Sequence, residues 1–430
     1  MSPKLFPRLS SGLLSLALTS LSADAGDWPQ LLGPNRNGVA VQETLYAEWS
    51  AQGPAVLWEA PVGAGFAGLA VQGDRAIAFV REGRSELVRC YSTASGKVLW
   101  ESATPCNWQG GISSDKGPRC VPVIAGDRVL TFGVEGRLRC VRLADGQEVW
   151  QRDTNADFKP LEGYFGVGST PVVFQDRVIV NVGGRDNASV VAFSLNDGST
   201  LWQVFTDAAS YSSPIVTQTG DTTLALVVTR LHLLGINAFT GEQVFSVPFG
   251  ARGPTVNGAT PIVDNGRVFV SSSYNIGALL AEFTSTSIQE LKRDETFLAT
   301  QYATPVAGSR EGVVFAVDGR QDDGLGSASL KCLDLNSWTV KWEQTGLDYG
   351  SAIRVDKDLL VLTCGGELIR VRASEDRYQE VARAQVLKPS DSGYRLPALS
   401  GGRLFIRDDQ TLRCLDVGPR SGGAAGATKK

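Results

Sequence analysis

A short phrase recurs along this chain: a hydroxyl-bearing residue, then proline, then β-branched residues. It occurs as Thr170-Pro171-Val172-Val173, Ser213-Pro214-Ile215-Val216, Thr260-Pro261-Ile262-Val263 and Thr304-Pro305-Val306, and related residues hold the same slot at Leu69, Pro122, Ala352 and Pro397. The eight slots are separated by 43 to 53 residues. Self-similarity at such a period is typical of solenoids, propellers and other repeat arrays. The chain is therefore expected to fold as a repeat.

The residues between slots predict four short antiparallel strands in each unit. A turn and an apolar run follow each slot, and the third strand ends in a small residue: Cys90, Cys140, Ala192, Gly235, Ala281 and Cys332. Ten residues later stands a large apolar residue: Trp100, Trp150, Trp202, Phe245, Leu291 and Trp342. Asp-Gly between alternating strands indicates a hairpin, and four strands in 40 to 50 residues are typical of a propeller blade. We expect the large residues to be wedges between neighbouring blades.

The two ends of the chain predict how the ring closes. The eighth unit, 396–416, offers three strands, and an orphan strand, 55–59, precedes the first slot. We therefore predict an all-β, eight-bladed β-propeller of four-stranded antiparallel blades over residues 26–418, closed by the N-terminal strand that completes the last blade. Residues 419–430 are expected to be a disordered tail. Seven blades is the alternative, because Arg370 fills the small slot of the seventh unit and Val381 falls one residue late.

The first 25 residues predict export. Lys4 and Arg8 precede the apolar run 13–18 and the small-residue site Ala23-Asp24-Ala25, which together are typical of a secretory signal peptide cut after about Ala25. The apolar run is shorter than the roughly 18 residues that span a bilayer, and no cysteine lies near the cleavage site. We expect a periplasmic or secreted protein without a membrane anchor.

Composition excludes several classes of function. The formal net charge is −4, so no basic field favours nucleic acid as a partner. The chain has one histidine, His232, which argues against Ser-His-Asp, Cys-His and multi-histidine metal catalysis.

The repeat, with its small residue on the third strand and its terminal tryptophan, resembles the pyrroloquinoline-quinone-like (PQQ-like) β-propeller family. Asp27-Trp28-Pro29-Gln30 and the segment 33–38 are similar to the opening of exported bacterial propellers in that group. The resemblance implies either a quinoprotein dehydrogenase or a non-catalytic relative such as the scaffold lipoprotein of the outer-membrane β-barrel assembly machinery. Those enzymes hold the quinone with adjacent half-cystines and use Ca²⁺ and a catalytic Asp. No two of the seven cysteines here are adjacent.

Loops carry function in a propeller because the strands are committed to packing. The residues that enter the first strand of each blade are expected to ring the central funnel: Phe66, Arg119, Gly168, Tyr211, Gly258, Tyr302, Tyr349 and Tyr394. Such a ring could grip a planar ligand, a sugar or a peptide. Alternatively, the tyrosines plug the channel and bond to neighbouring blades. His232 and Trp108 fall on the same face and could reach a ligand.

Two further features concern the loops. Cys106 and Cys120, before the second blade, could close a disulfide loop in an oxidising compartment. The hairpin 318–324 holds Asp318, Asp322 and Asp323 but lacks the spacing of a known Ca²⁺ loop, so we interpret it as solvated.

These observations predict an exported, monomeric, non-enzymatic propeller that presents loops to a protein or polymer partner in the cell envelope, with no cofactor. Two alternatives stay open. One is a PQQ-dependent quinoprotein dehydrogenase with a degenerate site, which would use PQQ with Ca²⁺, a blade 6 Asp as base, and Trp108 or a ring tyrosine as the stacking surface. The other is a carbohydrate-binding propeller.

Overall fold

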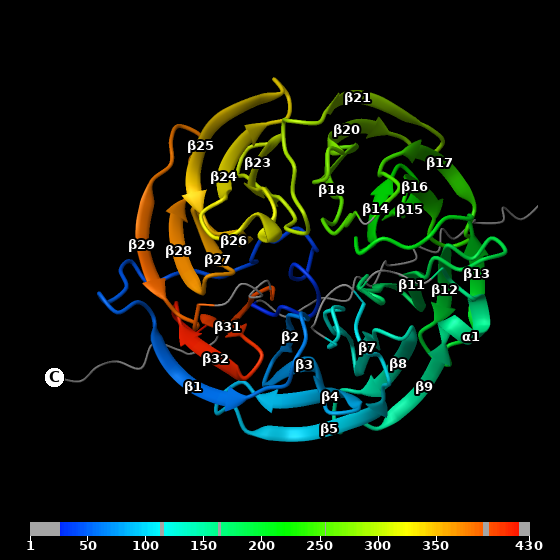
Figure 1. The fold of residues 1–430 in the computed structure, drawn as a ribbon, viewed down its shortest axis with the longest axis horizontal. Helices are drawn as coiled ribbons and strands as arrows, with labels where there is room; N and C mark the ends of the chain where they lie inside the picture. The colour runs from blue at the N-terminus through cyan, green and yellow to red at the C-terminus, as the bar shows by residue number, and fades with distance from the viewer. Residues whose placement is uncertain (1–25, 112–115, 162–164, 254, 390–394, 421–430) are drawn as a thin grey trace, which may run out of the picture.

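The computed structural model describes residues 26–111, 116–161, 165–253, 255–389 and 395–420. Within them the chain forms eight four-stranded antiparallel sheets arranged around one axis (Figure 1). Each sheet is a blade. Its four strands are named a to d in order, from the innermost strand near the axis to the outermost. The predicted signal peptide, Tyr394 and most of the predicted tail lie outside the described residues.

Blades 1 to 4 use consecutive strands. They are β2 (Leu69–Gln72), β3 (Arg75–Glu82), β4 (Ser85–Ser92) and β5 (Val98–Pro105); β6 (Val123–Ala125), β7 (Arg128–Phe132), β8 (Arg137–Arg142) and β9 (Glu148–Asp153); β10 (Val172–Phe174), β11 (Arg177–Asn181), β12 (Val190–Ser194) and β13 (Thr200–Val204); and β14 (Ile215–Thr219), β15 (Thr222–Val228), β16 (His232–Asn237) and β17 (Gln243–Pro248). A short helix, α1 (Thr154–Phe158), follows β9.

Blades 5 to 8 repeat the pattern. They are β18 (Ile262–Asp264), β19 (Arg267–Ser272), β20 (Gly277–Phe283) and β21 (Ile288–Asp294); β22 (Val306–Ala307), β23 (Val313–Asp318), β24 (Ala328–Asp334) and β25 (Thr339–Leu347); β26 (Gly350–Val355), β27 (Asp358–Thr363), β28 (Glu367–Arg372) and β29 (Glu380–Gln385); and β30 (Ala398–Ser400), β31 (Arg403–Arg407), β32 (Thr411–Asp416) and β1 (Ala55–Pro61). A 3₁₀ turn, η1 (Gln321–Asp323), lies between β23 and β24.

The predicted closure is confirmed. β1 pairs antiparallel with β32, and Trp58 lies opposite Cys414 (Figure 1). The seven-bladed alternative is wrong, because β26 to β29 form a complete blade in which Arg370 lies opposite Ala382. Closure leaves no blade at an open end of the ring, and open ends invite edge-to-edge association.

Hydrogen bonds near the axis account for the recurring hydroxyl-proline phrase. The backbone N–H of Val121 donates to Thr170 Oγ1 at 3.0 Å, that of Thr170 to Ser213 Oγ at 2.9 Å, and that of Thr260 to Thr304 Oγ1 at 2.9 Å. Each hydroxyl therefore satisfies a backbone donor of the preceding blade. The proline that follows keeps the hydroxyl-bearing residue extended.

The tryptophan wedges are also confirmed. The indole N–H of each of five strand-d tryptophans donates to a backbone carbonyl just after strand c of the next blade, and the pairs are Trp58–Thr93, Trp100–Leu143, Trp150–Leu195, Trp202–Ala238 and Trp342–Ser374. Blade 4 uses Phe245, whose ring lies 6.2 Å from Phe283. The expectation for Leu291 is wrong: Ala281 lies opposite Glu290 across a register shift, and Leu291 is 39% exposed.

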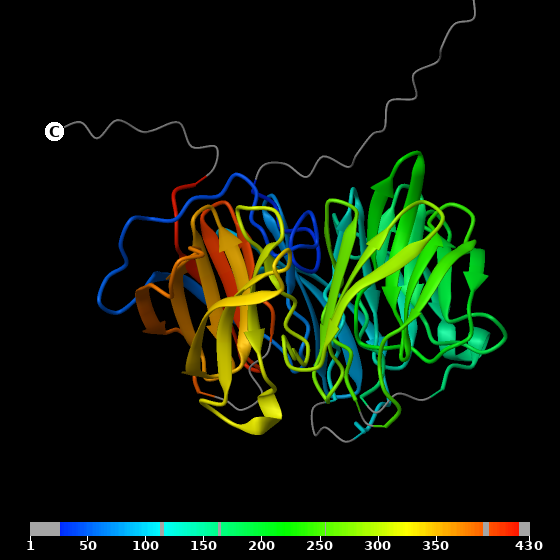
Figure 2. The ribbon, with the colours of Figure 1, turned by 90° about the horizontal axis from the view of Figure 1, so that it is seen from above.

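The segment before β1 crosses the axis on one side of the ring (Figures 1 and 2). Trp28 bridges to Val71 of blade 1, and Ala40 donates to the carbonyl of Arg354 in blade 7. Between them Leu31 and Leu32 pack against Val121, so this segment fills the centre with its own side chains.

Candidate functional site

The two faces of the ring differ. The b–c and d–a connections gather on one side, which we call the loop face, and the a–b and c–d turns gather on the other, the turn face. Figure 2 shows η1 on the loop face and the blue N-terminal segment on the turn face. The predicted funnel residues enter strand a from the loop face, so this face is the candidate site.

Five side chains form an arginine–aromatic arc on the loop face: Phe66, Arg119, Phe165, Tyr211 and Arg395. The Arg119 guanidinium lies 4.9 Å from the ring centre of Phe66 and 5.8 Å from that of Phe165. Arg395 approaches the Phe66 ring at 5.5 Å. Each cation–π contact of this kind contributes about 0.5–1 kcal/mol. The structure thus brings the predicted Phe66, Arg119 and Tyr211 into one assembly.

Tyr211 ends the arc. Its ring meets Phe165 edge-on at 5.8 Å, and its hydroxyl accepts the Phe165 backbone N–H at 2.9 Å. A Cβ at Gly168 would lie 2.5 Å from the Tyr211 ring. Close packing against the neighbouring tyrosine therefore explains why this ring position carries glycine.

Tyr302 and Tyr349 form the other side of the ring, and their centroids are 4.8 Å apart. Tyr349 is fully buried, and its hydroxyl accepts the backbone N–H groups of Gln301, Tyr302 and Ala303 at 2.9–3.0 Å. Burial raises the pKa of this phenol. The alternative role, in which a tyrosine bonds to the neighbouring blade, therefore describes Tyr349. Tyr302 is half-buried and donates to Gln321 Oε1 at 2.6 Å.

His232 lies on the loop face at the start of β16, beside blade 3. Its Nδ1 is 3.0 Å from Asp207 Oδ2, and its ring meets Phe205 edge-on at 5.1 Å. The same carboxylate oxygen accepts the Thr229 hydroxyl and the Leu231 N–H. These contacts tie the blade 3–blade 4 connection together.

The structure contradicts the Cys106–Cys120 disulfide, because both thiols are free and buried. Arg81 Nη1 donates to Cys106 Sγ at 3.0 Å, whereas Cys120 packs in the core between blades 2 and 3. Burial raises the pKa of Cys106 to about 11 and that of Cys120 to about 12. The correction has a simple cause: each cysteine belongs to a different packing environment, and loop length alone does not bring two thiols together.

Trp108 lies close to Gly166 in the same region, 3.5 Å from the position that a Cβ of that glycine would occupy. Its indole N–H is buried and has no partner among the described residues. Nearby Glu86, at the start of strand c in blade 1, accepts the Val134 N–H at 2.9 Å. Burial raises the pKa of Glu86 to about 7.

Arg36 fixes the N-terminal segment near the axis. Its guanidinium donates to the carbonyls of Thr170 and Pro171 at 3.1 and 2.8 Å and to Gln30 Oε1 at 3.1 Å. Burial lowers the pKa of Arg36 to about 9. In the sequence, the turn-rich segment 33–38 indicated only a resemblance to a family. Its position across the axis was not predicted.

The blade 6 carboxylates do not fit the Ca²⁺ site that the quinoprotein alternative requires. Asp318 Oδ2 is 2.8 Å from Lys331 Nζ, and its Oδ1 accepts the Ala299 N–H. Asp322 pairs with Arg320. Across the described ranges, no group of three or more His, Cys, Asp or Glu side chains is arranged to hold a metal ion.

Among the residues that the structure describes, no helix has the length and apolarity to cross a bilayer. Comparisons with known proteins then identify relatives. A family model described as outer membrane protein assembly factor BamB matches residues 37–151 and 84–320. A search of curated proteins gives no significant match.

Solved structures with this fold include BamB and several dehydrogenases. BamB from Moraxella catarrhalis is 14% identical, with a TM-score of 0.60 over 86% of this chain and 98% of that one. Quinohemoprotein alcohol dehydrogenase from Comamonas testosteroni is 12% identical, with a TM-score of 0.63 over 95% and 84%. A europium-containing methanol dehydrogenase is 10% identical, with a TM-score of 0.66 over 89% and 90%. At these identities the likeness establishes the fold alone.

Proposed function

Because this chain belongs to the family of PQQ-like β-propellers whose model is described as outer membrane protein assembly factor BamB, we propose that it is a non-enzymatic binding propeller. It is exported to the cell envelope, where its loop face binds a protein partner. The family and fold support a scaffold or binding role, and the blade 6 carboxylates Asp318 and Asp322 are paired with Lys331 and Arg320.

The observation that carries this proposal is the composition of the loop face. Of the large apolar side chains that the structure describes, the two most exposed, Leu161 at 60% and Leu325 at 61%, lie in its connections. On the same face, Arg119, Phe165 and Tyr211 of the arginine–aromatic arc are half-buried and present one guanidinium group and two rings, whereas Phe66 and Arg395 are buried beneath them. Aromatic and arginine side chains are enriched at the centres of protein interfaces.

Site-specific photo-crosslinking in the native envelope tests the proposal. A benzoylphenylalanine at position 161 or 325 is expected to cross-link to one discrete protein, and the substitution Arg119→Ala is expected to reduce the yield at least fivefold. The matched control is the same photoreactive residue at position 201, since Leu201 is exposed on the outer strand β13.

Absence of a cross-link at both loop positions, or equal yield at position 201, would contradict the loop face as a binding surface. The non-enzymatic part is tested separately by reconstitution with PQQ and Ca²⁺. Dye-linked oxidation of alcohols or sugars above the level of the protein without PQQ would refute it.

A further inference from the structure

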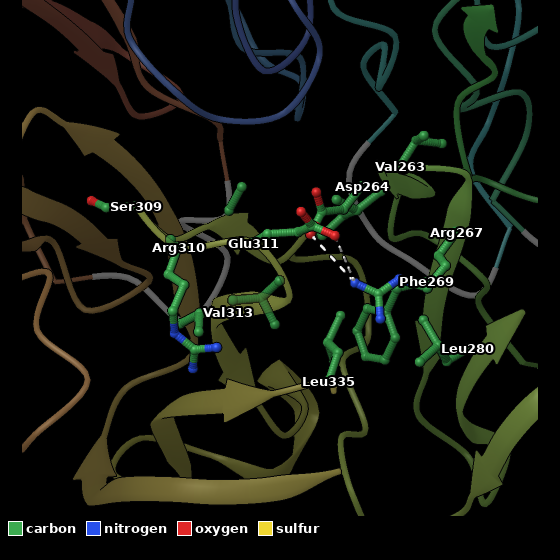
Figure 3. A pocket seen from close by; sticks show the side chains of 14 residues that line it. Val263, Asp264, Arg267, Phe269, Leu280, Ser309, Arg310, Glu311, Val313 and Leu335 are labelled. Carbon is green, nitrogen blue, oxygen red and sulfur yellow. Dashed lines mark ion pairs between the residues drawn. The ribbon is translucent and has the colours of Figure 1, made fainter. Parts of the chain in front are cut away.

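A cavity of about 230 Å³ lies at the junction of blades 5 and 6 on the turn face, away from the loop face (Figure 3). It opens beside two a–b turns, 264–267 of blade 5 and 307–313 of blade 6. Its apolar walls are Ile262, Phe269, Leu280, Val313, Val314 and Leu335, all of them buried in the protein.

The cavity lies at a junction that has no strand-d aromatic wedge. Blade 5 carries Leu291 where the strand-d tryptophan of five other blades donates its indole N–H to the next blade, and Trp338 of blade 6 packs here instead, edge-on to Phe269 at 6.2 Å. Leu335 is the counterpart of Leu143 and Leu195, which do accept such a bond. Trp338 stacks on Phe297 at 4.0 Å within this junction. The cavity nevertheless persists beside Leu335.

The size of the cavity suits one large side chain. An apolar cavity of roughly 150 Å³ holds a benzene molecule. About 230 Å³ is therefore sufficient for an aromatic ring with its linking carbon atom. The buried walls supply the apolar contact, and the open mouth between the two turns supplies the entry.

The charged side chains around the mouth determine which residues can flank that side chain in its own polypeptide. Asp264 and Glu311 are 37% and 55% exposed, and each lies near Arg267, at 3.9 and 3.7 Å, beyond hydrogen-bond distance. Arg267 instead donates to Asn336 at 2.6 Å. Figure 3 shows Arg310 pointing away from Asp264 and Glu311.

Arg310 is held by two further carboxylates, Asp334 and Glu375, each at 2.8 Å. Arg354 also donates to Ser309 of the lining, so four carboxylates and three arginines lie around this mouth. The acidic excess favours a cationic neighbour and disfavours an anionic one.

We propose that this cavity is a second binding site, which accepts an aromatic side chain of a partner polypeptide flanked by lysine or arginine. The ring enters between the two a–b turns and packs against the buried walls at Leu280, Val313 and Leu335. The flanking cation lies at Asp264 and Glu311. This site does not depend on the loop face, so either proposal can fail without the other.

Methyl NMR of the mature chain labelled at leucine and valine tests the site. The probe is the blocked pentapeptide Gly-Lys-Trp-Lys-Gly, with Gly-Glu-Trp-Glu-Gly and Gly-Lys-Ala-Lys-Gly for comparison. The first is expected to shift the methyl signals of Leu280, Val313 and Leu335. The second should bind at least fivefold more weakly, and the third should leave these signals in place.

A charge-reversed variant gives the matched comparison. Glu311→Lys is expected to weaken binding of the first peptide at least fivefold, because the exposed carboxylate at the mouth becomes a cation. Glu242→Lys makes the same change at an exposed c–d turn of blade 4 on the same face and should leave the affinity unchanged. Unshifted cavity signals, equal binding of the acidic peptide, or equal effects of the two variants would overturn the proposal.

Discussion

Single residues stabilise this ring chiefly by satisfying buried polar groups across blade boundaries. The hydroxyl of Thr170 and the indole of Trp202 each bond to backbone atoms of a neighbouring blade, and Tyr349 accepts three N–H groups at once. A buried polar group without a partner costs about 1–3 kcal/mol, so each of these side chains fixes the spacing of two blades as well as filling space. Glu86 differs, because the hydrogen bond from the Val134 N–H only partly offsets the cost of burying its carboxylate.

Glu86 predicts a pH-dependent stability. Burial raises its pKa from 4.5 to about 7, so the unfolded state ionises before the folded state does. The contribution of this carboxyl to the free energy of unfolding is largest below about pH 4.5, where it is protonated in both states. That contribution is lost as the pH rises from 4.5 to about 7. Glu86→Gln should therefore become more stable relative to the wild type between these pH values, by up to about 3 kcal/mol. Urea unfolding at pH 4.5 and pH 8 measures this difference, and the same difference at both pH values would contradict it.

Among the larger elements, the segment 26–54 determines what occupies the axis. It contacts blades 1, 2, 3, 7 and 8 before it becomes β1. Glu43 accepts the N–H groups of Gly401 and Gly402, and Arg370 donates to the carbonyls of Tyr46 and Ala47. Arg370 fills the small slot of blade 7, so this departure from the repeat serves to hold the segment in place.

Arg36 is the test of this element. Arg36→Leu removes the donors to Thr170 and Pro171, and two buried carbonyls lose their partner. The free energy of unfolding is expected to fall by about 2 kcal/mol. The control Arg75→Ala removes an arginine that pairs with the exposed Asp74, and it should change stability by under about 0.5 kcal/mol. Urea unfolding compares the two, and equal stability of both variants would exclude the anchoring role.

At the scale of the whole molecule, closure depends on one non-covalent pairing between the two ends of the chain. Trp58 in β1 donates to Thr93 of blade 1 and lies opposite Cys414 of β32. Its ring also approaches Phe405 at 5.9 Å. One side chain therefore joins both blades at the point of closure.

Trp58→Ala and Trp342→Ala compare the closing blade with an ordinary one. Both substitutions remove a wedge and should cost about 3–5 kcal/mol. Only Trp58→Ala is expected to speed hydrogen exchange in residues 411–416 by more than the loss of global stability explains. The reason is that no hairpin links β1 to β32, so β1 can separate from β32 while the rest of the ring stays folded. Exchange followed by mass spectrometry measures this. Equal protection of 411–416 in the two variants would show that closure is no weaker than other contacts.

Much of the architecture follows from local pattern. The slot spacing, the small residues on strand c and the tryptophans ten residues later specified eight blades and the closing strand, because each repeat makes the same contacts with its neighbour. The ring positions that the structure describes all precede strand a of a blade, since strand polarity determines which ends of the strands meet, and a ligand-binding role for them stays a prediction. Phe165 and Arg395 were missed because they lie in connections, where no period distinguishes one side chain from the next.

The sequence by itself determined the number of strands, their order and the wedges between blades, because these depend on contacts repeated at a fixed spacing. Only the tertiary structure decided that Cys106 and Cys120 stay apart, that residues 26–40 lie across the axis, and that a cavity lies beside Leu335. Each of these depends on contacts between residues far apart in the chain, or on the volume left after packing. Those quantities have no periodic signal in the sequence.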